Sequence, residues 1–302
     1  MSLDRFKEIT VALNTPFDKN DKVDIQKTKE LTKYLYNKGI RNLYVCGSTG
    51  EGFLLDNEER KMVVEAVCEE MKDKMTIIVH VGTASTKHAC ELAAHAQKCG
   101  AHAISAVPSV YYRLDETSVF NHWNEITKAS ELPFIIYNIP QLTGFNLSDK
   151  LLRKMCENEK VIGVKCSSDP AHDIARFKHI GGKDFIVFNG PDEQYLGGRM
   201  MGADAGIGGT YAAMPQLYLK LEELIRKENY EKAKELQATM LQYVYRLCSF
   251  GSLYGCVKSI IKLDGLDIGV PRKPFLPVDS ENEDLVKLYN DIQNTISEVG
   301  AW

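Results

Sequence analysis

Short apolar runs alternate with amphipathic stretches along the first two thirds of the chain. The runs are rich in β-branched residues and bounded by polar ones, which is typical of strands buried in a parallel sheet. Between them, apolar residues recur at helical spacing, as in Asp24–Lys38, Asn57–Lys72 and Thr86–Cys99. Eight runs are expected to form strands: Ile9–Leu13, Asn42–Cys46, Thr76–Val81, Ala103–Val107, Phe134–Tyr137, Val161–Lys165, Phe185–Phe188 and Ala205–Ile207.

This repeated strand–helix alternation predicts an α/β fold in which the strands close into a (β/α)8 TIM barrel. An open, doubly wound sheet is the alternative. That arrangement would be favoured by a glycine-rich nucleotide-binding turn after the first strand. The sequence at this point reads Thr15-Pro16-Phe17, so the closed barrel is the preferred prediction.

The pattern changes after Tyr211, where helical periodicity continues without further strands. Three prolines interrupt the connection between residues 269 and 277, which therefore cannot be helical throughout. We expect a catalytic barrel over residues 1–226, followed by a C-terminal helical extension over residues 227–302. The helices expected in this last part of the chain are Gln216–Lys227, Tyr230–Phe250, Val257–Leu263 and Glu283–Val299.

Composition and charge exclude several classes of partner. Hydrophobic residues make up 44% and charged residues 26% of the 302 positions, which is typical of globular proteins. The net charge of −4 and the lack of a basic cluster argue against nucleic-acid binding. No apolar stretch approaches the roughly 20 residues needed to span a bilayer. The N-terminal segment Met1–Phe6 lacks the apolar core of a signal peptide, so we expect no membrane partner.

The eight cysteines have irregular spacing and form no CxxC pair. Several stand within apolar runs, where a thiol acts as a small hydrophobic group. We therefore expect free thiols and a reducing, cytoplasmic location. Cys166 stands beside Lys165 but should face the other way, because adjacent residues of a strand point to opposite sides.

Lys165 closes the apolar run Val161–Lys165 and is the most unusual residue of the chain. An isolated ammonium in an apolar site costs several kcal/mol, so a buried amine tends to lose its proton. Burial can lower the pKa of a lysine by roughly 3–5 units from about 10.4. The neutral amine could then attack a ketone and form a Schiff base. A lysine that reaches the surface at a strand end is the alternative.

Other polar groups follow the ends of the predicted strands, where the active sites of such barrels lie. Ser48 and Thr49 follow the second strand in a glycine-rich turn before a helix, a setting that suits a carboxylate. A plain turn is the alternative there. Tyr137 closes the fifth strand, and Asp192 and Glu193 follow the seventh. Together with Lys165, these groups predict an amine-based site.

The sequence lacks the motifs of several other chemistries. No HExxH occurs among the seven histidines, and an outer-face or interface role suits His88, His95 and His102 better than a metal site. The absence of GxSxG and of an early GxGxxG argues against a serine hydrolase of that type and a nicotinamide-dependent oxidoreductase. The turn Gly206–Tyr211 could bind phosphate, but no lysine or arginine stands beside it.

Three motifs together resemble the pyruvate-dependent class I aldolases of the N-acetylneuraminate lyase and dihydrodipicolinate synthase superfamily. They are Gly47-Ser48-Thr49-Gly50-Glu51, Tyr137-Asn138-Ile139-Pro140 and Gly163-Val164-Lys165, in the order found in that family. The resemblance extends over nearly the whole chain. It implies a TIM barrel, a homotetramer, and Schiff-base chemistry that needs neither a metal nor a nucleotide cofactor.

The resemblance also implies catalytic roles. Lys165 would form the imine with pyruvate or another 2-keto acid, and Tyr137 would act as general acid and base. Ser48 and Thr49 would hold the substrate carboxylate and relay protons to Tyr137. In the family a tyrosine from a neighbouring subunit completes this relay. Tyr111, rather than the tyrosine that follows it, is the residue that matches it here.

Substrate contacts follow from the same resemblance. Dihydrodipicolinate synthases carry an arginine after the YN-P motif to clamp a second carboxylate, and Leu142 stands in that place. Asp192 and Glu193 would accept hydrogen bonds from sugar hydroxyls, as in the neuraminate lyases. Further substrate contacts are expected from Ser167, Gly190, Gly208 and Gly209.

These features predict a lyase that cleaves N-acetylneuraminate to pyruvate and N-acetylmannosamine. The lyases usually have serine in place of Gly209 and another apolar or aromatic residue in place of Pro191. Dihydrodipicolinate synthase, or an aldolase or dehydratase acting on a shorter 2-keto-3-deoxy sugar acid, therefore stays open. A non-catalytic barrel that only senses pyruvate or a sugar acid is a third possibility, but a mere binder does not need a buried amine.

Overall fold

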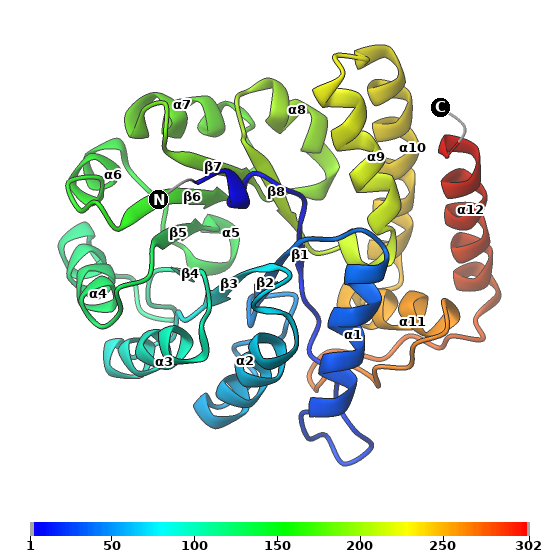
Figure 1. Cartoon of the computed structure of the whole chain (residues 1–302), viewed down its shortest axis with the longest axis horizontal. Helices are drawn as coiled ribbons and strands as arrows, with labels where there is room; N and C mark the ends of the chain where they lie inside the picture. Colours follow the sequence, from blue (N-terminus) through cyan, green and yellow to red (C-terminus); the bar gives the residue numbers. More distant parts are fainter. Residues whose placement is uncertain (1–2, 301–302) are drawn as a thin grey trace.

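Eight parallel strands close into a barrel in the computed structural model, which describes residues 3–300 (Figure 1). Each strand pairs with the next, and β8 pairs with β1. The predicted (β/α)8 TIM barrel is therefore confirmed. The strands are β1 (Thr10–Ala12), β2 (Asn42–Val45), β3 (Thr76–His80), β4 (Ala103–Ala106), β5 (Phe134–Asn138), β6 (Val161–Cys166), β7 (Ile186–Asn189) and β8 (Ala205–Gly208).

Helices cover the outside of this barrel, as the alternating sequence pattern predicts (Figure 1). They are α1 (Ile25–Asn37), α2 (Asn57–Met71), α3 (Thr86–Cys99), α4 (Glu116–Lys128), α6 (Asp149–Met155), α7 (His172–Gly181) and α8 (Tyr195–Met200). The short helix α5 (Pro140–Thr143) lies instead directly after β5, at the end of the barrel (Figure 1). Short 3₁₀ helices lie at Asp4–Phe6, Asp192–Gln194 and Tyr211–Ala213. Met1, Ser2, Ala301 and Trp302, which belong to the expected terminal segments, lie outside the described residues.

Four further helices follow the barrel and pack beside α1 on one side of it (Figure 1). They are α9 (Pro215–Arg226), α10 (Tyr230–Ser249), α11 (Leu253–Leu263) and α12 (Glu283–Val299). Helix α11 begins four residues before its predicted start at Val257. Ser252 explains the difference, because its side chain caps the helix by accepting a hydrogen bond from the Gly255 N–H group.

The strands are continuous apolar runs because both faces of the sheet are buried. Side chains inside the barrel form one hydrophobic cluster that includes Tyr44, Ile135, Tyr137 and Phe188. Side chains on the outer face form a second cluster with the surrounding helices. The barrel interior is therefore a packed core, and the active site of such a barrel lies at the carboxyl ends of the strands.

All eight cysteines are unpaired and several are buried, which confirms the prediction of free thiols. The Cys166 side chain lies on the side away from the barrel interior, where its Sγ is 3.1 Å from Ser168 Oγ. Within residues 3–300, no helix has both the length and the apolar character that crossing a bilayer requires.

Candidate active site

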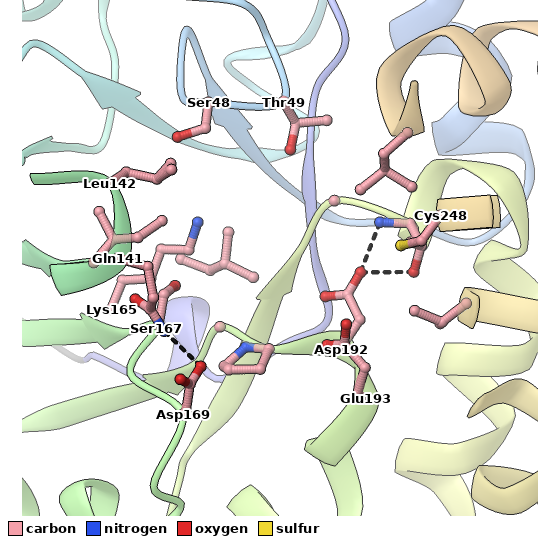
Figure 2. Close-up of a pocket in the computed structure, with 18 of the residues that line it drawn as sticks. Ser48, Thr49, Gln141, Leu142, Lys165, Ser167, Asp169, Asp192, Glu193 and Cys248 are labelled. Atoms are coloured by element: carbon pink, nitrogen blue, oxygen red, sulfur yellow. Dashed lines mark hydrogen bonds between the residues drawn. The ribbon is translucent and has the colours of Figure 1, made fainter. Parts of the chain in front are cut away.

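A cavity of about 260 Å³ opens at the carboxyl ends of the strands, where the sequence places the candidate residues. All the expected site residues except Tyr111 and Gly208 line it. In Figure 2, Ser48, Thr49, Lys165 and Asp192 are directed into this common space. The expected residues that line the cavity are Ser48, Thr49, Tyr137, Leu142, Lys165, Ser167, Gly190, Asp192, Glu193 and Gly209.

Lys165 lies in this cavity and does not extend to the outer surface. Its side chain comes from β6, next to Tyr137 of β5, and the residue is only 6% exposed. Its Nζ atom is 4.1 Å from the centre of the Tyr137 ring and 4.8 Å from that of Tyr44. The alternative of a lysine that reaches bulk solvent at a strand end is therefore wrong.

Two neighbouring rings pack against the Tyr137 side chain. The rings of Tyr44 and His80 meet it edge to face, at centroid distances of 5.9 and 5.8 Å. Burial, together with the Arg60 guanidinium, holds the pKa of His80 well below its usual value. The imidazole Nε2 accepts a hydrogen bond from the Val107 N–H group, as a neutral ring can. His80 therefore adds no positive charge beside Tyr137.

Ser48 and Thr49 belong to a tight turn that follows β2. The turn is closed by hydrogen bonds from the Gly52 N–H group to the Gly47 carbonyl and from the Glu51 N–H group to the Ser48 carbonyl, each 3.0 Å long. A Cβ atom at Gly52 would lie 2.1 Å from the Cys46 carbonyl oxygen, so only glycine fits there.

The expected helix N-terminus does not lie at this turn. Helix α2 begins only at Asn57, and Asp56 and Glu59 cap it with a reciprocal pair of hydrogen bonds. The expectation that the helix dipole acts directly at Ser48 and Thr49 is therefore wrong. The hydroxyl groups of these two residues are what the turn offers to a substrate carboxylate.

Asp192 has one oxygen held by the protein and one without a partner. Its Oδ2 atom accepts hydrogen bonds from the Thr210 N–H group at 2.7 Å and the Thr210 hydroxyl at 2.6 Å. Its Oδ1 atom is buried and has no hydrogen-bond partner among the described residues. Burial raises the pKa of this carboxyl group to about 6. The free oxygen can therefore accept a hydrogen bond from a ligand that enters the cavity.

Three glycines leave room for these side chains. A Cβ atom at Gly208 would lie 2.3 Å from Asp192 Oδ1, so Gly208 supports the site although it does not line the cavity. A Cβ atom at Gly190 would lie 2.0 Å from the Ser167 hydroxyl. At Gly209 the nearest atom would be Thr49 Oγ1, at 3.0 Å. A serine at position 209 would therefore crowd the turn that carries Thr49.

One wall of the cavity comes from the C-terminal helices, which the sequence analysis missed. Val244 and Cys248 of α10 and Leu253 and Tyr254 of α11 line the cavity. These residues follow no strand, and nothing in their local sequence marks them as part of a site. The remaining lining residues that were not expected there are Ile139, Gln141, Asp169, Pro191, Ile207 and Thr210.

A hydrogen bond crosses the rim of the cavity beside Leu142. The Gln141 side-chain amide donates to Asp169 Oδ1 at 2.6 Å, and so joins α5 to the loop after β6 (Figure 2). Leu142 lines the cavity and is 65% exposed. An apolar side chain therefore stands where a carboxylate clamp would need an arginine.

Tyr111 lies outside the cavity of its own chain. It is 90% exposed, and its ring meets that of Tyr112 edge to face at 5.2 Å. Its backbone has φ +81°, an uncommon value for a residue other than glycine. The role expected for it, in the site of a neighbouring subunit, stays a prediction.

The three evenly spaced histidines do not converge on one site. His95 Nε2 is 2.8 Å from Glu65 Oε1, and His102 Nδ1 accepts a hydrogen bond from the Ile77 N–H group. Glu65, His95 and Cys99 bring possible ligand atoms within 4.8 Å of one another on the outer helices α2 and α3. This group shares no residue with the cavity lining found in the described part of the chain.

Known proteins are similar to this chain over nearly its whole length. Residues 5–293 match the dihydrodipicolinate synthetase family. N-acetylneuraminate lyase of Mediterraneibacter gnavus is 41% identical over 289 residues, which cover 95% of this chain and 92% of that protein. N-acetylneuraminate lyase 2 of Escherichia coli is 34% identical over 282 residues, with coverages of 93% and 92%.

A solved structure extends the similarity to the whole fold. The catalytic lysine mutant of the sialic acid aldolase of Ruminococcus gnavus superposes with a TM-score of 0.96 at 39% identity, and the match covers 99% of both chains. The resemblance inferred from the three sequence motifs is thus confirmed, and this chain belongs to the dihydrodipicolinate synthetase family.

Proposed function

We propose that this protein is a Schiff-base aldolase, a carbon–carbon lyase that cleaves N-acetylneuraminate to pyruvate and N-acetylmannosamine. The observation that carries the proposal is the buried Lys165 amine beside Tyr137, in a cavity that also holds the Ser48 and Thr49 hydroxyls. The names of the two relatives reported above support the substrate, because both are N-acetylneuraminate lyases that match over more than 90% of this chain.

The reaction begins with addition of the Lys165 amine to the C2 ketone of the open-chain sugar acid. The adduct takes the phenol proton of Tyr137 and loses water, which leaves a protonated imine that links Nζ to C2 and a Tyr137 phenolate that can act as the base in the next step. The Ser48 and Thr49 hydroxyls donate hydrogen bonds to the substrate carboxylate and hold C2 against the amine. Lys165 lies next to Tyr137 in the β5–β6 register, so the phenol is close to the same reacting carbons.

Cleavage follows from the electron demand of the imine. Tyr137 removes the proton from the C4 hydroxyl, the C3–C4 bond breaks, and its electron pair moves into the imine to give an enamine and the free aldehyde. The phenol then returns a proton to C3, and water hydrolyses the imine to release pyruvate and the amine. Because the imine is itself the electron sink, we propose that the reaction needs no metal and no nucleotide.

The sugar end of the substrate would lie against β7 and β8. Asp192 Oδ1 is free to accept a hydrogen bond from a sugar hydroxyl, and Glu193 lines the same wall. Leu142 offers no charge to a second carboxylate, which disfavours condensation with aspartate semialdehyde. A shorter 2-keto-3-deoxy sugar acid is the second candidate, because Gly209 lacks the serine hydroxyl usual in the lyases.

Assembly and location are part of the same proposal. We infer a homotetramer, which would bring Tyr111 of one subunit to the site of another. We also infer a cytoplasmic location, which the eight unpaired cysteines support.

The decisive experiment traps the imine. Incubation with pyruvate and borohydride should add one reduced pyruvate at Lys165, because reduction turns the imine into a stable amine. Lys165→Ala should abolish labelling and turnover. Lys165→Arg should do the same, since a guanidinium stays protonated and cannot attack a ketone. Lys262→Ala, on the outside of α11, serves as the control and should label normally.

Peptide mapping and a substrate panel separate the alternatives. A pyruvyl mass shift on another lysine, or undiminished turnover of Lys165→Ala, would contradict the mechanism. Pyruvate release should be fastest from N-acetylneuraminate among a panel of 2-keto acids. Faster release from a shorter sugar acid would leave the mechanism in place and identify the second candidate as the substrate.

A further inference from the structure

A buried ion pair ties the Ser48–Thr49 turn to the C-terminal helix α11. Lys258 Nζ lies 2.9 Å from Glu51 Oε1, and the two side chains are 1% and 0% exposed. Glu51 is the last residue of the Gly47–Glu51 motif, and Lys258 stands 207 positions further along the chain. We propose that Lys258 and Glu51 are positioning residues that hold the Ser48–Thr49 turn, and with it the carboxylate-binding hydroxyls, at the correct distance from Lys165.

The backbone of Glu51 is part of the turn, whereas its side chain does not line the cavity. Its N–H group donates to the Ser48 carbonyl at 3.0 Å, and its φ of +56° is uncommon for a residue other than glycine. Its Oε2 atom accepts a hydrogen bond from the Arg272 N–H group at 2.7 Å. A movement of this carboxylate would therefore be passed directly to Ser48.

Lys258 is held in place by two further segments, the one that follows β1 and the one that follows α11. Its ammonium group donates to the Thr15 carbonyl at 2.8 Å and to the Val270 carbonyl at 3.1 Å. With Glu51 Oε1 as its ionic partner, three oxygen atoms therefore lie within 3.1 Å of the ammonium group. Thr15 in turn donates its hydroxyl to the Gly50 carbonyl at 2.6 Å, so Lys258 supports the turn by a second route.

The same helix carries a wall of the cavity. Tyr254 lines the cavity and stands one helical turn before Lys258 on α11. Lys258 therefore fixes two parts of the site relative to each other, the hydroxyl-bearing turn and the Tyr254 wall. Neither Lys258 nor Glu51 lines the cavity among the described residues, so their effect on substrate is indirect.

Stability alone does not explain such a pair. Two charges removed from water lose their hydration, and well-packed apolar residues of similar volume are often as stable or more so. Burial raises the pKa of Glu51 and lowers that of Lys258, and each charge opposes the shift of the other. The pair does supply a directional link between two segments that are far apart in sequence. Apolar contacts would define the relative position of these segments less exactly.

The test separates positioning from folding, and it rests on the proposed function. Lys258→Met leaves Glu51 buried and unpaired, whereas Lys258→Met combined with Glu51→Gln removes both charges at nearly constant volume. Lys38→Met is the matched control, because Lys38 pairs with Asp264 at the far end of the same helix, 2.6 Å away, and does not touch the turn. For each protein we measure the thermal unfolding midpoint and the pyruvate concentration that gives half-maximal borohydride labelling of Lys165.

We expect the double variant to fold, yet to need about 10- to 100-fold more pyruvate for half-maximal labelling, the range expected when reacting groups are misplaced by up to 1 Å. Lys38→Met should lower the unfolding midpoint and leave the half-maximal concentration unchanged. A double variant that labels at the wild-type concentration would overturn the inference. A wild-type protein that does not label at all would instead overturn the proposed function.

Discussion

Asp192 shows how a single side chain can serve both the fold and the substrate. Its Oδ2 atom is fixed by two hydrogen bonds from Thr210, while its Oδ1 atom is left buried without a partner. An ionised carboxylate accepts a stronger hydrogen bond from a hydroxyl than a neutral carboxyl group does. The protonation state of Asp192 should therefore affect how tightly a sugar acid is bound.

The pH dependence of sugar-acid cleavage should report on this group. Burial raises the pKa of Asp192 to about 6, so the carboxylate is ionised at pH 7 and becomes protonated as the pH falls through 6. At pH 5 about one tenth of the Asp192 carboxyl groups remain ionised. The value of kcat/KM for the sugar acid should therefore fall by up to about 10-fold. Steady-state kinetics between pH 5 and 8 measure the effect.

Asp192→Asn provides the comparison, because an amide of the same shape cannot ionise. The variant should have a lower kcat/KM at pH 7 and should lose the part of the pH dependence that is centred near 6. Labelling of Lys165 by pyruvate, which has no sugar hydroxyls, should change little. An Asn variant that keeps the full pH dependence would show that another group is responsible.

The loops that follow β6 and β7 approach each other too closely for any side chain at Gly190. A Cβ atom there would lie 2.0 Å from the Ser167 hydroxyl and 2.8 Å from the Cys166 carbonyl oxygen, and the latter cannot move away easily. Gly190→Ala should therefore destabilise the protein by about 1–3 kcal/mol, the usual range for overpacking. It should also lower kcat/KM, because Lys165 and Asp192 are carried by these two strand ends.

Gly197 on α8 is the matched control for this prediction. A Cβ atom there meets nothing within 4 Å, and the residue lies inside a helix. Gly197→Ala should stabilise the protein by about 0.5 kcal/mol, because alanine loses less conformational entropy in a helix than glycine does. Urea denaturation measures both variants. If Gly190→Ala and Gly197→Ala are equally stable, the loops after β6 and β7 make room for a side chain more easily than their packing indicates.

The strands and the residues that close them were predictable from the sequence, for a physical reason. A parallel strand buried on both faces must be apolar throughout, so a polar residue at its end is conspicuous, as Lys165 and Tyr137 are. Each observed strand end differs from the predicted one by at most one residue. Strand-end reasoning and the family resemblance together identified ten of the 20 residues that line the cavity.

The C-terminal part of the site was not predictable in this way. Tyr254 and Cys248 stand on amphipathic helices, where an aromatic or a thiol group that faces a cavity has the same sequence pattern as one that faces the core. Glu51 and Lys258 look like ordinary surface charges until the fold brings them together across the chain. Contacts of this kind depend on tertiary structure, which leaves no local periodicity in the sequence.

The proposed assembly gives a reason for the conformation of Tyr111. This residue combines a positive φ of +81° with 90% exposure, and such a backbone costs about 1–3 kcal/mol. Strain of this size is usually retained where it serves a function. If Tyr111 completes the proton relay of a neighbouring subunit, one chain alone has an incomplete site.

Two single variants test this role. Tyr111→Phe should lower kcat by about 10²-fold or more, the usual share of a general acid–base group, and leave imine formation with pyruvate largely intact. Tyr112→Phe removes the hydroxyl of the adjacent ring and should have little effect on kcat. Equal losses in both variants would indicate that the tyrosine pair matters for packing rather than for proton transfer.

Mixed oligomers decide whether Tyr111 acts across a subunit interface. Lys165→Ala chains lack the nucleophile but retain Tyr111, whereas Tyr111→Phe chains retain the nucleophile. After the two variant proteins are unfolded together and refolded, some Tyr111→Phe sites will face a neighbour that supplies the intact tyrosine. Activity of the mixture should therefore rise above the residual activity of Tyr111→Phe refolded alone, whereas Lys165→Ala refolded alone should stay inactive. Because the restored sites need two chains, activity should also fall on dilution as the oligomer dissociates. A mixture no more active than its components, or a wild-type monomer in sedimentation that is fully active, would place the whole proton relay within one chain.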